Sequence, residues 1–214
     1  MKFELAIFDM DGLLLDTERV YERVFVLTAA QMGYKGTKEM YARTLGVGNN
    51  RAKEIFKEIY GADFPSEKFL ANSHVNILKD IEQNGLPERP GATEILNLLD
   101  RKKIKKTVAS SNDKDFVMFA LERGGMAGRF DAVNTAQDVK RTKPAPDLFL
   151  KSAADFNIPP EKCIIFEDSE NGVLAANAAK IRVCLVPDIK MPSEEIKSKS
   201  FRVYKTLHDA LELF

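Results

Sequence analysis

Short apolar runs alternate with stretches of helical periodicity along most of this chain. The apolar runs predict buried strands at residues 5–8, 105–109, 132–134, 163–166 and 182–186. Between and after them, apolar residues recur at three- and four-residue spacing, which predicts helices at residues 93–101, 113–123, 147–157, 170–179 and 206–213. Strand–helix alternation of this kind predicts an α/β fold with a doubly wound parallel sheet that is covered by helices on both faces.

Residues 17–85 break this alternation. They contain no convincing strand, and apolar residues recur at helical spacing, first from Val20 to Leu27 and again from Leu70 to Ile81. The breaker-rich residues 85–91 then lead back into the alternation. We therefore predict two domains: a core formed by residues 1–16 and 86–214, and an all-helical insert at residues 17–85, directly after the first strand.

Two aspartates end the first predicted strand. Asp9 and Asp11 are followed at once by Gly12, and residues two apart in an extended segment point the same way. Two close carboxylates repel each other unless a cation, a shared proton or a division of chemical roles offsets the repulsion. Mg²⁺ is the hard cation that suits such oxygen ligands. The alternative is an acidic turn, since Asp and Gly are common turn residues.

The second predicted strand ends in small polar residues just before a helix. Ser110, Ser111 and Asn112 could bind an anion there together with free backbone N–H groups, or they could simply cap the helix. Lys143 stands just ahead of a helix whose start is fixed by prolines. The helix dipole disfavours a cation at that position, so the lysine either meets an anion or is a solvated surface residue.

The fourth predicted strand repeats the arrangement of the first. Glu167 and Asp168 follow its apolar run, either as ligands or as acidic caps of the next helix. In a doubly wound sheet, all these strand ends meet at one edge. A bound Mg²⁺ beside a phosphoryl group accounts for every one of them, whereas the capping alternative requires four coincidences.

Composition narrows the functional classes. Lys plus Arg equals Asp plus Glu at 32 each, so no overall charge attracts nucleic acid or an anionic membrane. No apolar stretch reaches the length of a membrane helix or has the form of a signal peptide. Cys163 and Cys184 lie in apolar runs and lack the spacing of a metal site. We expect a cytoplasmic protein, a monomer, without a structural disulfide.

Taken together, these motifs resemble those of the haloacid dehalogenase superfamily of phosphotransferases. Asp9-Met10-Asp11-Gly12, Ser110, Lys143-Pro144 and Glu167-Asp168 stand where the four motifs of that superfamily belong, and the run from Phe8 to Glu18 is similar to its β-phosphoglucomutase-like branch. The resemblance implies a Rossmann-like core, a helical cap inserted after the first strand, and a small phosphorylated metabolite as substrate.

The resemblance also implies a role for each residue. Asp9 would be the nucleophile that forms an aspartyl-phosphate, and Asp11 would be the general acid and base. Mg²⁺ would be held by Asp9, the backbone carbonyl of Asp11 and Asp168, with Glu167 in support. Ser110 and Lys143 would hold the transferring phosphoryl group, with Ser111 and Asn112 beside them.

The resemblance leaves three functions to weigh. Sugar-phosphate mutases of the branch carry a cap histidine where this chain has Tyr21, a lysine where it has Leu45 and an arginine where it has Asn49, although Arg51 could supply the missing charge. These departures favour a phosphatase over a mutase. A receiver-type phospho-acceptor module also combines Asp, a hydroxyl and Lys, but it has no helical insert and no second aspartate of this kind. We expect a Mg²⁺-dependent phosphatase acting on a sugar or nucleoside phosphate.

Overall fold

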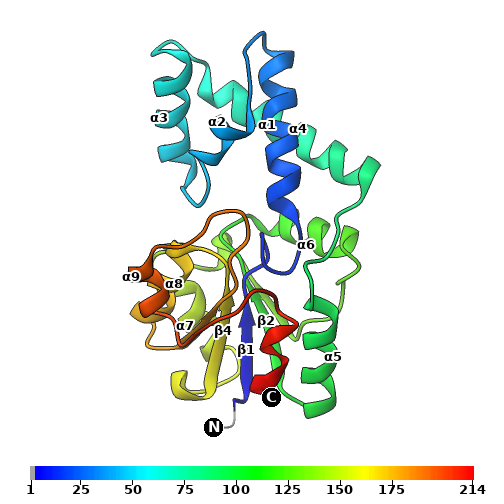
Figure 1. Cartoon of the computed structure of the whole chain (residues 1–214). Helices are drawn as coiled ribbons and strands as arrows, with labels where there is room; N and C mark the ends of the chain where they lie inside the picture. The colour runs from blue at the N-terminus through cyan, green and yellow to red at the C-terminus, as the bar shows by residue number, and fades with distance from the viewer. Residues whose placement is uncertain (1–2) are drawn as a thin grey trace. The chain divides into compact units, whose positions relative to one another are not determined.

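The computed structural model describes residues 3–214, which divide into two compact units (Figure 1). The core unit comprises the described residues up to Asp16 together with Leu86–Phe214, and the inserted unit comprises Thr17–Gly85. Over the described residues, no helix combines the length and the apolarity that crossing a membrane requires.

The core unit is built on a parallel sheet. Its described strands are β1 (Leu5–Phe8), β2 (Lys105–Ala109), β3 (Ala132–Asn134), β4 (Cys163–Glu167), β5 (Arg182–Leu185) and β6 (Arg202–Val203). They lie in the order β3-β2-β1-β4-β5-β6, and every adjacent pair is parallel. Leu5 of β1 is in register with Lys105 on one side and Cys163 on the other. This is the strand order of a doubly wound Rossmann-type sheet, so the predicted fold class is confirmed.

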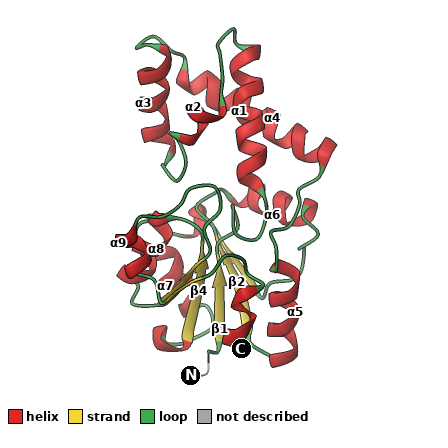
Figure 2. Ribbon diagram, in the orientation of Figure 1, coloured by secondary structure: helices red, strands yellow, loops and turns green. Residues whose placement is uncertain are grey.

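Helices cover both faces of this sheet (Figure 2). Leu5 and Ile7 of β1 belong to a buried apolar cluster with residues of α7 (Asp147–Ala154), α8 (Glu170–Ala178) and α9 (Glu194–Ser198). On the alternate positions, the rings of Phe8 and Phe166 stack at 5.0 Å, with Phe130 and Phe214 against them. The remaining helical segments of the core unit are α5 (Ala92–Lys102), α6 (Lys114–Arg123), η1 (Ala136–Asp138), η2 (Pro160–Lys162) and η3 (Asp209–Leu213).

The end of the chain differs from the prediction. A regular helix over residues 206–213 was expected, but only the short 3₁₀-helix η3 forms there. The carboxylate of Asp209 accepts hydrogen bonds from the backbone N–H and the hydroxyl of Thr206, at 3.0 and 2.9 Å. These local side-chain bonds form a turn that competes with the helix.

The inserted unit is helical throughout and has its own core. It consists of α1 (Thr17–Gln31), α2 (Lys38–Ala42), α3 (Asn49–Tyr60) and α4 (Ser66–Asn84). The ring of Phe69, 1% exposed, lies 4.9 to 5.5 Å from the rings of Phe25, Phe56 and Phe64. Tyrosines extend this aromatic cluster on the side of Phe64. The apolar residues at helical spacing therefore pack on one another inside the unit.

The two chain segments that leave and re-enter the core unit run side by side within it. Asp16 N–H donates to the carbonyl of Pro87 at 2.9 Å, and Arg89 N–H donates to the carbonyl of Leu14 at 2.8 Å. The Arg89 guanidinium also pairs at 2.9 Å with the buried carboxylate of Asp188, in the loop after β5. These contacts fix both connections at the carboxyl edge of the sheet.

Candidate active site

The first aspartate follows β1 directly and is held against the neighbouring strand. Asp9 N–H donates to the carbonyl of Phe166 at 3.0 Å, which continues the β1–β4 ladder by one residue. The chain then turns sharply at Gly12, whose φ of 73° lies in the left-handed region that glycine adopts without strain. This turn ends the strand and leaves Asp9 and Asp11 at the carboxyl edge, beside the point where the strand order reverses.

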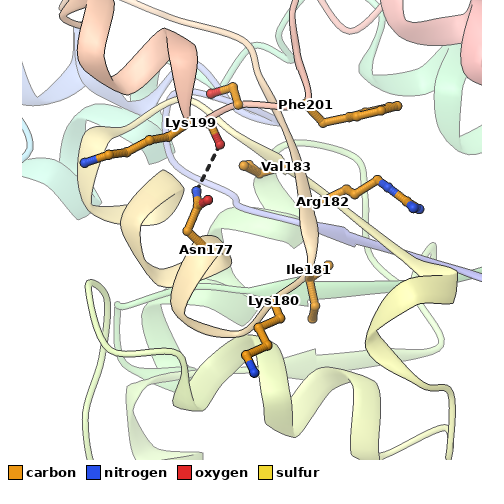
Figure 3. Close-up of a pocket in the computed structure, with 8 residues that line it drawn as sticks. Asn177, Lys180, Ile181, Arg182, Val183, Lys199 and Phe201 are labelled. Atoms are coloured by element: carbon orange, nitrogen blue, oxygen red, sulfur yellow. Dashed lines mark hydrogen bonds between the residues drawn. The ribbon is translucent and has the colours of Figure 1, made fainter.

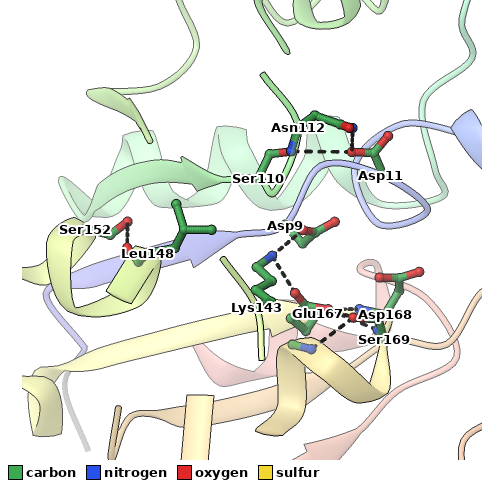
Figure 4. Close-up of polar contacts among 11 residues, drawn as sticks. Asp9, Asp11, Ser110, Asn112, Lys143, Leu148, Ser152, Glu167, Asp168 and Ser169 are labelled. Atoms are coloured by element: carbon green, nitrogen blue, oxygen red, sulfur yellow. Dashed lines mark hydrogen bonds and ion pairs between the residues drawn. The ribbon is translucent and has the colours of Figure 1, made fainter. Parts of the chain in front are cut away.

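The second aspartate is bound to the segment after β2. Asn112 donates through its side-chain amide to Asp11 Oδ2 at 2.9 Å, and Ser110 Oγ lies 3.5 Å from the same oxygen (Figure 4). Ser110 Oγ in turn accepts from the backbone N–H of Asn112 at 3.1 Å. Capping of α6 is performed by Asp113, which accepts from Phe116 N–H at 3.0 Å. Ser110 and Asn112 are therefore not capping residues, and Ser111 beside them is exposed.

Lys143 is buried between two carboxylates. Its side chain is 5% exposed, and the ammonium contacts Asp9 Oδ1 and lies 2.6 Å from Glu167 Oε1 (Figure 4). The nitrogen also stands 5.0 Å above the ring of Phe149 in the first turn of α7. Two long-range ion pairs and one aromatic ring hold this lysine, so the alternative of a solvated surface lysine is excluded.

Glu167, fully buried, is the last residue of β4. While one oxygen accepts from Lys143, the other accepts from the backbone N–H groups of Asp168 and Ser169, both at 3.0 Å, and from the Ser169 hydroxyl at 2.9 Å. Ser169 is the N-cap of α8 and accepts from Gly172 N–H at 3.1 Å. Glu167 thus both pairs with the lysine and satisfies free donors ahead of a helix.

Burial and neighbouring charge set the protonation of the central pair. The pKa of Asp9 is raised to about 8: burial raises it most, Lys143 lowers it, and the charges of Glu167 and Asp11 raise it. Burial lowers the pKa of the Lys143 ammonium, but the two carboxylates beside it outweigh that effect and hold its pKa above its ordinary value. The lysine therefore keeps its proton, and the charge state of Asp9 depends on what else binds beside it.

The donor set of the site suits a cation that needs few protein ligands. Within residues 3–214, no cluster of three or more His, Cys, Asp or Glu residues is arranged as a metal site. Asp9 and Asp168 nonetheless follow adjacent parallel strands, and the Asp11 backbone offers a carbonyl oxygen beside them. All of these are oxygen donors, and Mg²⁺ is commonly held by one or two carboxylates while it retains waters. The residues present therefore fit Mg²⁺.

A family model described as haloacid dehalogenase-like hydrolase matches residues 6–186. That range includes β2, β4, all of β1 except Leu5, and every residue of the site described above. The chain belongs to the haloacid dehalogenase-like hydrolase family. The resemblance drawn from the sequence motifs is thereby confirmed.

Several relatives in this family are named as phosphatases. The chain is 33% identical over 178 residues to the phosphorylated carbohydrates phosphatase of Thermotoga maritima, covering 83% of this chain and 82% of the relative. It is 32% identical over 215 residues to a Drosophila melanogaster protein named as a probable pseudouridine-5'-phosphatase, covering 95% and 90%. A Thermotoga maritima crystal structure provisionally named as a β-phosphoglucomutase superposes with a TM-score of 0.83 at 28% identity, over 99% and 98% of the two chains. These likenesses support a hydrolase of phosphoric monoesters.

The residues that the sequence suggests for substrate specificity lie in the inserted unit. Arg51, a candidate for binding substrate charge, pairs with Glu54 at 2.8 Å and with Glu58 at 3.0 Å. Arg43 shares Glu58 at 2.6 Å. The charge of Arg51 is therefore already balanced within α3, which weakens its case as the replacement for the missing mutase cations.

A basic hollow of about 280 Å³ lies elsewhere on the core unit, at the amino end of β5 (Figure 3). Two of the cations that line it already have partners. Lys199 pairs with Glu195 at 2.6 Å, and the Arg182 guanidinium lies over the rings of Phe3 and Phe201. The hollow is at the edge of the sheet opposite the motif residues, so it is not a part of the candidate active site.

Some features of the site were not predicted from the sequence. Lys143, Glu167, Asp9 and Asp11 were all selected from strand-end positions, but the pairing of Lys143 with Glu167 was not foreseen. Ser169 and Gly172 were not selected at all. A serine followed three residues later by glycine, right after an acidic pair, is the signal that could have marked them.

Proposed function

We propose that this chain is a Mg²⁺-dependent phosphatase that hydrolyses a small phosphomonoester through an aspartyl-phosphate intermediate. The observation that carries the proposal is the buried ammonium of Lys143, which contacts Asp9 Oδ1 and Glu167, with Asp11 two residues further along the chain. A lysine in this position neutralises negative charge next to a candidate nucleophile, which is what phosphoryl transfer requires.

In the proposed reaction, a carboxylate oxygen of Asp9 attacks the phosphorus, and the bond from phosphorus to the ester oxygen breaks. Asp11 gives its proton to the leaving oxygen and so releases the alcohol. A water molecule then attacks the phosphorus of the aspartyl-phosphate, Asp11 takes its proton, and inorganic phosphate leaves with Asp9 restored. Lys143 and Ser110 hold the phosphoryl oxygens during both steps.

Mg²⁺ would be held by Asp9, the Asp11 backbone carbonyl and Asp168. When bound, it would supply positive charge to the phosphoryl oxygens. Glu167 supports the site from behind by holding Lys143 and the backbone of Asp168, at 2.6 and 3.0 Å.

The names of the relatives support a substrate class. The relatives named above act, by their names, on phosphorylated carbohydrates and on a nucleoside monophosphate, so we propose a sugar or nucleoside phosphate. A sugar-phosphate mutase is the second candidate, favoured by the provisionally named β-phosphoglucomutase structure. Tyr21, Leu45 and Asn49 replace the mutase cap residues, and Arg51 is neutralised by its glutamates, which favours water as the acceptor. The cytoplasmic location and the monomeric state stay predictions.

The test is phosphate release from a panel of sugar phosphates, nucleotides and an aryl phosphate. It is run with Mg²⁺, with excess chelator, and with the Asp9→Asn variant. We expect release that requires Mg²⁺ and is abolished by Asp9→Asn in a folded protein. Transfer of phosphate between hydroxyls of one sugar, without release, would establish the mutase instead. Release that survives Asp9→Asn would contradict the assignment of the nucleophile.

A further inference from the structure

In the first turn of α8, the Glu167 carboxyl group occupies the space where a Cβ at residue 172 would lie. Gly172 is the third residue of this helix, and a Cβ built on it would lie 1.8 Å from Cδ of Glu167 and 2.0 and 2.2 Å from its two oxygens. Ordinary contact begins at 3.4 Å. Any side chain at residue 172 would therefore displace the Glu167 carboxyl group by more than 1 Å, or displace the helix.

The displaced group is the one that holds Lys143. Glu167 Oε1, which accepts from the lysine at 2.6 Å, is the oxygen 2.0 Å from the hypothetical Cβ. Glu167 has no exposed surface, so its carboxylate has no solvent-filled space to move into. Loss of this contact would leave Lys143 attached to Asp9 and to the face of Phe149 alone.

We infer that Gly172 is a positioning residue of the active site. It contacts no reacting atom, but the space above its Cα lets Glu167 fold onto the start of α8, and Glu167 in turn fixes the ammonium of Lys143 at Asp9. The expected effect on kcat rests on the proposed function, whereas the expected displacement of the Glu167 carboxylate does not. Conformational permissiveness is not the reason for this glycine, because it lies within a regular helix, where glycine is unfavourable.

Displacement of Lys143 should affect the chemical step. The lysine neutralises charge that builds up on the phosphoryl group, and a misplacement of about 1 Å in such a group can cost on the order of 100-fold in rate. For Gly172→Ala we expect kcat to fall about 10- to 100-fold, while KM changes by less than about threefold, because substrate binding away from the phosphoryl group is untouched.

The experiment compares four proteins: wild type, Gly172→Ala, Glu167→Asp and the double variant. The shorter aspartate withdraws the carboxylate from residue 172 and from Lys143 alike, so Glu167→Asp alone should also lower kcat. If Gly172→Ala acts by displacing Glu167, it should lower kcat little further in the Glu167→Asp background. Ala178→Met, which adds a side chain at an exposed position of the same helix, is the matched control and should keep the wild-type kcat. A helix that is merely destabilised would lower the melting temperature, and Gly172→Ala would then lower kcat by the same factor in both backgrounds.

A crystal structure of Gly172→Ala gives a reading that is independent of activity. We expect the Lys143–Glu167 contact to be broken. A wild-type kcat for Gly172→Ala, an intact contact, or the same loss of kcat in both backgrounds would each overturn the inference. If Gly172→Ala does not fold, a folded double variant supports the inference and an unfolded one overturns it. Failure of the wild type to release phosphate would contradict the proposed function, and the broken contact would still test the role of Gly172.

Discussion

Asp9 is a buried carboxylate whose charge depends on its partners. Its side chain is 11% exposed, and burial raises its pKa to about 8 despite the ammonium of Lys143. A protonated carboxyl group is a poor nucleophile, so the proposed reaction at neutral pH needs a second positive charge at this group. A bound Mg²⁺ would supply it and lower the pKa of Asp9.

This coupling predicts pH-dependent binding of Mg²⁺. Below a pKa of about 8, the cation must displace the proton of Asp9, so its affinity should rise by up to about tenfold per pH unit and level off above that pKa. Calorimetric titration of the substrate-free protein with Mg²⁺ between pH 6 and pH 9 measures this directly. The Asp9→Asn variant is the control and should bind weakly, with a flat profile. An affinity for the wild type that is independent of pH would rule out the coupling.

The role of Asp11 predicts a dependence on the leaving group. Asp11→Asn cannot protonate the departing oxygen, so we expect phosphate release from an alkyl phosphate to fall by about 10² to 10⁴. An aryl phosphate releases a more stable anion and should lose much less in its first step. Stopped-flow measurement of alcohol or phenol release separates that step from hydrolysis of the intermediate. Equal losses for both esters would argue against general-acid catalysis by Asp11.

The site residues could be identified from the sequence, but the contacts between them could not. Asp9, Asp11, Ser110 and Glu167 could be selected because each ends an apolar run that reads as a buried strand. The contact of Lys143 with Glu167 could not be predicted, because it joins a loop residue to the end of β4, 24 positions further along the chain. The space above Gly172 depends on a rotamer of Glu167, which no sequence pattern encodes.

Among the elements, all five predicted strands are present. The strands β1, β2 and β3 have the predicted bounds, and β4 and β5 each differ from the prediction by one residue at the carboxyl end. The strand β6 was missed because it has only two residues, Arg202 and Val203, both exposed. The helix α9 was missed as well, since its five residues are mostly charged or polar and it is held by capping at Ser193 and by contacts with α8.

The buried position of β4 and β5 predicts that both cysteines are unreactive. Burial raises the pKa of the Cys163 and Cys184 thiols to about 12 each, which lowers the thiolate fraction near pH 8 about a thousandfold. We expect native protein to resist iodoacetamide at pH 8 while the denatured chain is alkylated at both residues. Intact-mass spectrometry over several hours follows the reaction. Rapid alkylation of either cysteine in native protein would contradict the burial of its strand.

The whole molecule has two hydrophobic cores, and the sequence of one unit is inserted within the sequence of the other. The core unit closes around a sheet whose first strand is separated from the second by the whole of Thr17–Gly85. The inserted unit relies on the aromatic cluster around Phe69. Each unit is therefore stabilised by contacts of its own.

Separate cores predict that the inserted unit can be destabilised selectively. Phe69→Ala should cost about 3–5 kcal/mol of packing free energy within that unit. Hydrogen exchange followed by mass spectrometry should show lost protection at residues 17–85, with the strands of the core unit still protected. Leu27→Ala, at an exposed position of α1, is the control and should change little. Equal loss of protection in both units would mean that they unfold as one.

In the proposed reaction, Asp9 becomes covalently phosphorylated during turnover. The most direct measurement is to quench the enzyme in acid during hydrolysis of an aryl phosphate, reduce it with borohydride and map it by mass spectrometry. Reduction converts an aspartyl-phosphate to homoserine, so we expect homoserine at position 9, dependent on both Mg²⁺ and substrate and absent from Asp9→Asn. Homoserine at another aspartate, or phosphate release by direct attack of water with no modified residue at any quench time, would contradict it.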